Sequence, residues 1–318
     1  MANNILVLNM PNLSKNQKLF IGTIINGLDY GGYDNYPRIE TLRKDKIKLP
    51  IKGGKIYFEF MDRFIDKLEK EQTDKLEKYL LAAELKEYNL NDEEQEFIKC
   101  KDDFSNDIDS LLNDKLKKIE WGEYRIGDLF DKINTKKLPY KAKELPSNAT
   151  GEYILPCLTS SFMNQGLNYF APKENATILK NVISIPSNSD VYRAYYQSKE
   201  FTVLSDAYAI CWKDKNIKIT SNQYLFMTLC INKVTDLPIY SYKNKLGGWN
   251  VVKNKYILLP QTNGKIDFYF MEKIIRIVKK ILIKDVVLYT NRKADKKSRR
   301  YRSHKWKKRK KLVKRKRK

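Results

Sequence analysis

One stretch of the sequence occurs twice, and it decides how the chain is organised. The second copy, Leu259–Glu272, reads LPQTNGKIDFYFME, and the first copy, Leu49–Asp62, reads LPIKGGKIYFEFMD. They share Leu-Pro, Gly-Lys-Ile and Phe-x-Phe-Met at the same spacing, at an offset of 259 − 49 = 210 residues. A solenoid unit repeats every ~20–50 residues, so this period is too long for one. The sequence therefore predicts a duplicated module.

Each copy is preceded by a short apolar segment and followed by a long one. Leu19–Asn26 resembles Leu225–Asn232 in its Leu-Phe and Ile-Asn pairs. Their apolar spacing predicts short helices at Leu19–Asn26 and Gln223–Asn232. After the copies, apolar residues recur every three or four positions, which predicts helices from about Tyr57 to Tyr88 and from Asp267 to about Leu288. The first of these, roughly 32 residues, would span about 48 Å.

Between these helices the pattern changes. Asn91 followed by three acidic residues is typical of a capped helix start and predicts an acidic helix to about Lys118. The residues expected on its core face are Phe97, Phe104, Ile108 and Leu112. Runs of β-branched and aromatic residues predict strands at Tyr153–Leu158, Val182–Pro186, Phe201–Leu204 and Tyr208–Trp212. Near the N-terminus we expect strands at Asn4–Leu8 and Ile47–Pro50, and a turn-rich loop at Gly31–Pro37.

Positive charge is concentrated at the C-terminus. Residues 290–318 hold 18 Lys/Arg and one acid, which is +17 of the net +24 and leaves +7 for the remaining residues. Neutralising phosphates releases counterions, so this balance suits a polyanionic partner. The tail has no core-forming pattern and is expected to be disordered. It is interpreted as a nonspecific DNA contact, a readthrough product or an RNA contact.

Several kinds of site are unsupported by the sequence. Four scattered cysteines without a CxxC pair, and the single histidine His304, exclude a zinc site of ordinary spacing. There is no Asn/Asp-Pro-Pro-Tyr/Phe string for adenine methylation, no glycine-rich cofactor loop and no phosphate-binding loop. No apolar run is long enough to cross a bilayer, and no signal pattern is present, so a cytoplasmic chain is expected. We therefore expect no catalytic residue, metal or cofactor in this chain.

Four motifs together resemble the DNA specificity subunit of bacterial type I restriction-modification systems. A W-x-x-Y-x-I-x-D-L-F string begins at Trp121, and T-S-S…N-x-G follows at Thr159–Gly166. Tyr196–Phe201 supplies Y-Q…F, and the pattern ends with Leu259–Glu272. The resemblance covers about residues 119–288 as one target-recognition domain with its helix. Residues 1–118 look like the back part of a first such domain with its spacer.

The resemblance implies an α+β fold, with target-recognition domains of mixed short strands and helices joined by long antiparallel coiled-coil spacer helices. The implied boundaries are 1–56 for a partial first domain, 57–118 for the central helical spacer, 119–266 for a complete second domain, 267–289 for a C-terminal spacer helix and 290–318 for the tail. Double-stranded DNA and a methyltransferase subunit, and possibly a restriction subunit, are the implied partners. Catalysis and S-adenosylmethionine would belong to those partners, and the target would be a bipartite site or a half-site. The implied partner-binding residues are Met61, Ile65, Leu68, Leu76, Leu80, Ile274, Val278 and Ile281.

Three polar loops are expected to read bases, because amide and guanidinium groups pair with purine edges. Turn formation or phosphate contact is the simpler interpretation of any one of these residues. The candidate DNA-binding residues are Thr159, Ser160, Asn164 and Gln165 in the first loop, Arg193, Tyr195, Tyr196, Gln197 and Lys199 in the second, and Tyr242, Lys243, Asn244 and Lys245 in the third. Trp121 is expected to anchor the core rather than stack on a base, and Asp267 to cap its helix.

The first copy departs from the pattern. About a hundred residues expected before Asn4 are absent, Tyr57 stands where the second copy has Asp267, and the basic tail replaces further spacer. A truncated or frame-shifted product would explain these departures. Two other interpretations stay open, namely a C-terminal fragment of a fused restriction-methylation enzyme and a coiled-coil scaffold with nonspecific nucleic-acid affinity.

Overall fold

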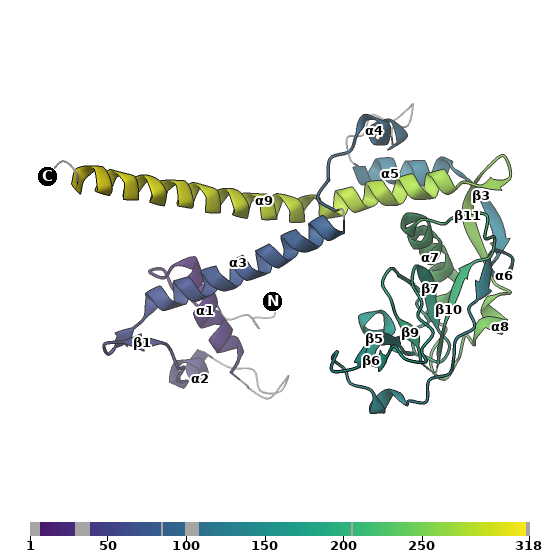
Figure 1. The fold of residues 1–318 in the computed structure, drawn as a ribbon, viewed down its shortest axis with the longest axis horizontal. Helices are drawn as coiled ribbons and strands as arrows, with labels where there is room; N and C mark the ends of the chain where they lie inside the picture. Colours follow the sequence, from purple (N-terminus) through teal and green to yellow (C-terminus); the bar gives the residue numbers. More distant parts are fainter. Residues whose placement is uncertain (1–6, 29–38, 84, 99–107, 205, 316–318) are drawn as a thin grey trace. The chain divides into compact units, whose positions relative to one another are not determined.

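The computed structural model describes residues 7–28, 39–83, 85–98, 108–204 and 206–315 (Figure 1). The chain divides into two compact units. Unit 1 comprises Met1–Glu87 and Ile283–Lys318, and unit 2 comprises Tyr88–Leu282. Helix α9 (Phe268–Arg315) contributes to both units.

Unit 2 combines three small sheets with helices, which confirms the α+β class. The four-stranded sheet has the order β4-β10-β7-β8, and two three-stranded sheets have the orders β12-β11-β3 and β6-β5-β9. Its helices are α4 (Asp92–Ile98), α5 (Ile108–Lys118), α6 (Ile126–Leu129), α7 (Ser221–Thr235), α8 (Trp249–Val252) and the 3₁₀ turns η1 (Ala142–Glu144) and η2 (Met163–Gly166). Its strands are β3 (Glu120–Arg125), β4 (Phe130–Lys132), β5 (Tyr153–Leu158), β6 (Leu167–Pro172), β7 (Val182–Pro186), β8 (Tyr195–Gln197), β9 (Thr202–Val203), β10 (Ala207–Trp212), β11 (Tyr256–Thr262) and β12 (Lys265–Ile266).

Helix α7 lies against strands β7, β8 and β11 and closes the main core of unit 2 (Figure 1). Ile183, Ile210 and Met227 are fully buried there. Trp121 does not anchor the core from inside as the sequence predicts, because it is 36% exposed; its ring stacks on Phe226 at the edge of the core, and its Nε1 donates to the Leu116 carbonyl. All four strands predicted for this unit are present.

Unit 1 is smaller and mainly helical. Helix α3 packs on α1, with Met61 and Leu80 fully buried. Its elements are α1 (Lys15–Asn26), α2 (Ile39–Lys44), the two-stranded hairpin β1 (Ile51–Lys52) and β2 (Lys55–Ile56), α3 (Phe58–Ala82) and the later part of α9.

The duplication is visible in side-chain contacts as well as in the amino-acid sequence. Ser14 and Gln17 form a capping box at the start of α1, and Thr220 and Gln223 form the same box at the start of α7. The Ser14 hydroxyl donates to Asp62, and the Thr220 hydroxyl donates to Glu272. Asp62 and Glu272 occupy the same position of the repeated stretch. Both modules therefore join their short helix to their long helix through one hydroxyl–carboxylate contact.

Helix α3 is shorter than predicted. It ends at Ala82, so its 25 residues span about 38 Å rather than 48 Å. The following segment turns into α4, where Asn91 and Glu94 exchange the capping bonds that the sequence predicts.

The prediction that the tail is disordered is wrong for residues 290–315, because α9 continues to Arg315. Lysine, arginine and alanine are good helix formers, and the segment contains neither glycine nor proline. A segment without a core-forming pattern can therefore still form a helix.

Some other predictions differ from the structure or lie outside it. The first strand of the repeat is Ile51–Lys52 rather than Ile47–Pro50, and residues 7 and 8 of the predicted strand Asn4–Leu8 are not in a strand. Residues 4–6, the loop Gly31–Pro37 and Phe104 lie outside the described residues. Within the described ranges, no helix has the length and apolar character needed to cross a membrane.

The cap of α9 gives a first testable prediction. Asp267 accepts a 2.8 Å bond from the Phe270 backbone amide and one from the Thr262 hydroxyl, whereas Tyr57 makes no side-chain cap bond at α3. Asp267→Ala should cost about 1 kcal/mol. Amide exchange in the first turn of α9, measured by mass spectrometry, should therefore accelerate about fivefold.

The matched control is Asp267→Asn, which keeps an oxygen acceptor and should preserve protection. Tyr57→Asp should slow exchange in the first turn of α3. If Asp267→Ala left exchange unchanged, the capping role would be excluded.

Candidate functional site

The first predicted loop is a left-handed turn that presents two exposed amides. Asn164, Gln165 and Gly166 have φ values of 48°, 55° and 84° in succession. Such values are uncommon for residues with a Cβ and occur where surrounding structure enforces them. Here the Asn164 amide donates to the Leu167 carbonyl, and the Thr159 hydroxyl and backbone amide both donate to the Gly166 carbonyl. Asn164 and Gln165 are left exposed.

The second predicted loop leads into β8 and lies beside the first. The hydroxyl of Tyr195 donates to the Phe162 carbonyl at 3.2 Å, and that of Tyr196 to Asn181 at 3.0 Å. Arg193 pairs with Asp236 at 2.6 Å, and this hydrogen bond raises the pKa of the guanidinium. Arg193 and Lys199 are exposed.

Two of the predicted base-reading residues do not fit that role. Gln197 is 4% exposed, and its Nε2 donates to the Gln165 carbonyl at 3.2 Å and to the Ser184 hydroxyl at 3.0 Å. Thr159 is 8% exposed, and its hydroxyl donates to the Gly166 carbonyl at the end of the turn. A buried amide must find partners within the protein, so both residues hold the first loop instead of facing solvent.

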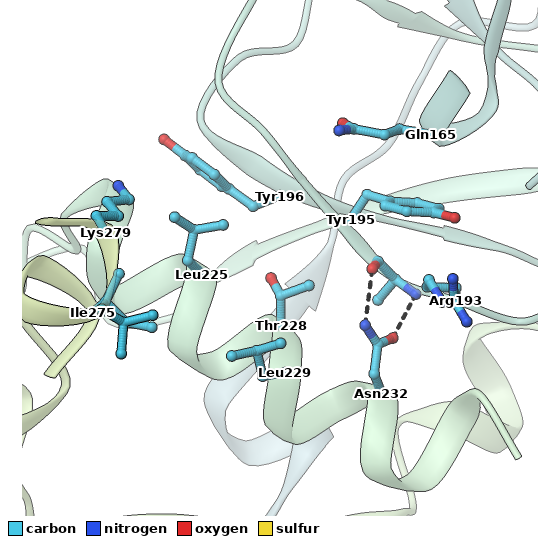
Figure 2. A pocket seen from close by; sticks show the side chains of 12 residues that line it. Gln165, Arg193, Tyr195, Tyr196, Leu225, Thr228, Leu229, Asn232, Ile275 and Lys279 are labelled. Carbon is cyan, nitrogen blue, oxygen red and sulfur yellow. Dashed lines mark hydrogen bonds between the residues drawn. The ribbon is translucent and has the colours of Figure 1, made fainter. Parts of the chain in front are cut away.

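A pocket of about 320 Å³ lies beneath these two loops (Figure 2). Gln165, Arg193, Tyr195 and Tyr196 line it from the loops and β8, and helices α7 and α9 supply its other side. The remaining lining residues are Ala194, which immediately precedes β8, and, from the helices, Leu225, Thr228, Leu229, Asn232, Ile275, Val278 and Lys279.

Two residues that were not predicted from the sequence hold the floor of the pocket in place through hydrogen bonds. The Asn232 side chain accepts from the Ala194 amide at 2.7 Å and donates to its carbonyl at 3.1 Å, as Figure 2 shows. Lys279 donates to Asn222, and burial lowers the pKa of its amine. Asn232 belongs to the Ile-Asn pair that occurs in both modules, and this repetition could have marked it in the sequence. Nothing in the sequence distinguished Lys279 from other helix lysines.

The third predicted loop is exposed at Tyr242, Lys243, Asn244 and Lys245. Its backbone is anchored, since the Tyr242 amide donates to Asp190 and the Asn244 side chain donates to the Ile239 carbonyl. The Lys245 amine sits 4.8 Å from the centre of the Tyr242 ring. These residues do not line the pocket of the other two loops.

The predicted partner-binding residues divide by exposure. Met61, Leu80 and Ile274 are buried and therefore offer no surface to a partner. Leu68 is 40% exposed, and Val278 lines the pocket. The remaining seam residues, Ile65, Leu76 and Ile281, are half-buried.

The described cysteines are ordinary packing residues. Cys157, Cys211 and Cys230 are free thiols. Burial raises the pKa of Cys157 and of Cys230 to about 12, which disfavours the reactive thiolate. In the part of the chain that the structure covers, no cluster of His, Cys, Asp or Glu could hold a metal ion.

Comparison with known families decides the chain's affiliation. The model described as "Type I restriction modification DNA specificity domain" matches residues 118–301, more than half of the chain. The chain belongs to this family. The matched range includes both pocket-lining loops and the third loop, together with the first part of α9.

Relatives of this specificity domain carry corresponding names. The type II restriction enzyme BgcI specificity subunit S.BcgI of Heyndrickxia coagulans is 26% identical over 266 residues, which are 82% of this chain and 66% of the relative. The chain thus spans just under two thirds of that relative. The expectation of a specificity component is confirmed by the family match.

Solved structures of specificity subunits are also similar to the chain. The S subunit of a type I restriction-modification system from M. genitalium matches with a TM-score of 0.42 at 16% identity, covering 89% of this chain and 67% of that one. The HsdS subunit from Thermoanaerobacter tengcongensis matches with a TM-score of 0.34 at 13% identity, covering 87% and 62%.

The buried position of Gln197 in this specificity domain gives a second prediction. Gln197→Ala removes two bonds inside the fold, so we expect the free energy of unfolding to fall by about 1–3 kcal/mol. Lys199→Ala, two residues away and exposed, should change it by less than about 0.5 kcal/mol. Urea unfolding followed by tryptophan fluorescence measures both. If both substitutions changed the free energy of unfolding by the same small amount, Gln197 would again be a candidate for base contact.

Proposed function

We propose that this chain is the sequence-reading component of a restriction-modification complex and that unit 2 contacts one half-site in double-stranded DNA. The family match supports DNA specificity as the class of function. The observation that carries the assignment to particular residues is the enforced left-handed turn, which holds the Asn164 and Gln165 amides exposed. The turn fixes the backbone from which these side chains project, and a side-chain amide can pair with the N6 and N7 edge of adenine.

The other exposed residues divide into two roles. Tyr195 and Arg193 border the same surface as Gln165, and they extend it with an aromatic face and a guanidinium. Lys199, Lys243 and Lys245 are exposed cations on neighbouring loops. Lysines suit phosphates, which fix register without carrying sequence information.

Catalysis in this proposal belongs to a partner methyltransferase, and a restriction subunit joins the same complex. The residues Ile65, Leu68 and Leu76 of α3 would supply a docking surface on unit 1, and Val278 and Ile281 of α9 would supply one on unit 2.

Replacing the presented amide tests the reading role. Gln165→Ala should change the sequence selected from a pool of randomised duplexes, because removing one bidentate base pairing costs about 1–3 kcal/mol in discrimination. Lys243→Ala should weaken binding to all sequences alike, because a phosphate contact is not sequence-specific. An unchanged selected sequence for Gln165→Ala would contradict the assignment.

Removing the basic tail tests the division between affinity and specificity. Deletion of residues 290–318 takes away +17 of the net charge. Affinity for every duplex should fall, and the slope of log K against log salt should flatten by about 0.9 for each phosphate that the tail no longer neutralises. The selected sequence should stay the same. A sequence preference that vanished with the tail would place the reading function there.

A further inference from the structure

Two adjacent large apolar side chains project from the first loop of unit 2. Phe162 is 48% exposed and Met163 is 63% exposed, and they directly precede the exposed amides of Asn164 and Gln165. The other residues of this loop, within 159–166, are small or polar. Contiguous exposed apolar surface is typical of interaction sites, so the pair calls for a partner with an apolar group of its own.

Hydrogen bonds hold the backbone of this pair in place on both sides. The Phe162 carbonyl accepts from the Tyr195 hydroxyl at 3.2 Å, and the Met163 amide donates to the Ser161 hydroxyl at 3.1 Å. The left-handed turn begins directly after Met163, with Asn164 at a φ of 48°. The two apolar side chains and the two amides therefore project from one fixed stretch of backbone.

The charge of the surrounding sequence argues against a phosphate contact for this loop. Residues 153–172 contain no Asp, Glu, Lys or Arg. A duplex can approach the stretch without repulsion from an acid of its own, and the stretch has no cation to offer a phosphate. Base edges are the remaining DNA contact, and the C5-methyl group of thymine is the apolar group that base pairs present in the major groove.

An amide and an apolar side chain on one turn together match an A·T pair. In the major groove, adenine offers the N7 acceptor and the N6 donor to an amide, and thymine offers its methyl group. Consecutive Cα atoms are about 3.8 Å apart, so those of Met163 and Gln165 are separated by at most roughly 7.6 Å. Base pairs follow one another every ~3.4 Å, which places the bases that these two side chains reach within about three steps of each other.

We propose that Phe162 and Met163 read thymine methyl groups in the major groove, next to the adenine contacts of Asn164 and Gln165. This inference rests on the proposed function of unit 2 and adds a chemical class to its target, namely A·T pairs recognised by amide and methyl contacts together. The selected half-site should therefore contain a thymine within about three base pairs of the position whose preference changes in Gln165→Ala.

Replacing thymine by deoxyuridine removes this methyl group and leaves the hydrogen-bonding groups of the base unchanged. The test takes the duplex that the full chain selects from a randomised pool and changes each thymine in turn to deoxyuridine. Fluorescence anisotropy measures binding at a salt concentration that suppresses the phosphate contacts of the basic tail. Near the position that depends on Gln165, deoxyuridine should weaken binding about fourfold, because one methyl group is withdrawn from a buried contact.

Variants of the chain assign this difference to the pair. Phe162→Ser and Met163→Ser are tested separately and together, and in the double variant the ratio of thymine to deoxyuridine affinity should fall to about one. Leu258→Ser is the matched control, because it changes a 54% exposed apolar residue on β11 and should keep the fourfold ratio. All four substituted side chains are exposed, and circular dichroism checks that each variant folds.

The outcomes separate this inference from the proposed function. Equal affinity for thymine and deoxyuridine at every position, or a ratio that the double variant leaves unchanged, would overturn the inference although the chain still selects a sequence. A selected sequence without an A·T pair near the position that depends on Gln165 would overturn it as well. If the chain enriched no sequence from the pool, the proposed function would fail and this inference with it.

Discussion

The structure of both modules depends on a hydroxyl–carboxylate contact between a capped short helix and the long helix that follows the repeated stretch. In unit 2, Glu272 accepts from the Thr220 hydroxyl at 2.5 Å and from the Asn222 amide at 2.7 Å. Partial burial alone would raise the pKa of this carboxyl, but the bonds from Thr220 and Asn222, and the nearby Arg276, lower it overall. The contact therefore requires an ionised acid and weakens as pH falls through that lowered pKa, whereas the unfolded chain ionises at a higher pH.

From this contact a continuous series of bonds leads to the reading surface. Thr220 opens α7, and Asn232, near the other end of the same helix, holds the backbone of Ala194 at the entrance to β8. Strand β8 ends at Gln197, whose side chain holds the Gln165 carbonyl. The backbone of Gln165 is thus positioned by rigid elements that are joined to α9, as the proposed reading role requires.

Periodic patterns in the sequence predicted the main helices and part of the sheets. The solvent exposure of the predicted site residues then showed which of their side chains face outward. Four of the ten strands described in unit 2 were predicted, because their β-branched runs are bounded by turns, and the long helices were predicted because their apolar residues recur every three or four positions. The end of α3 and the helical tail were missed, because helix ends and isolated basic helices carry weak apolar signals. The candidate loops were predicted from composition alone, which does not show that the Gln197 side chain faces inward while the Gln165 side chain faces solvent. The pocket depends on residues distant in sequence and had no signature.

The central claim is that a partner's methylation follows the sequence that this chain reads. The most direct measurement is methylome sequencing of cells that express a methyltransferase which co-purifies with the chain, with and without the chain itself. The account predicts that modified adenines share a defined sequence when the chain is present and that this set disappears when it is absent. The same methylated sites in both cultures would contradict the claim.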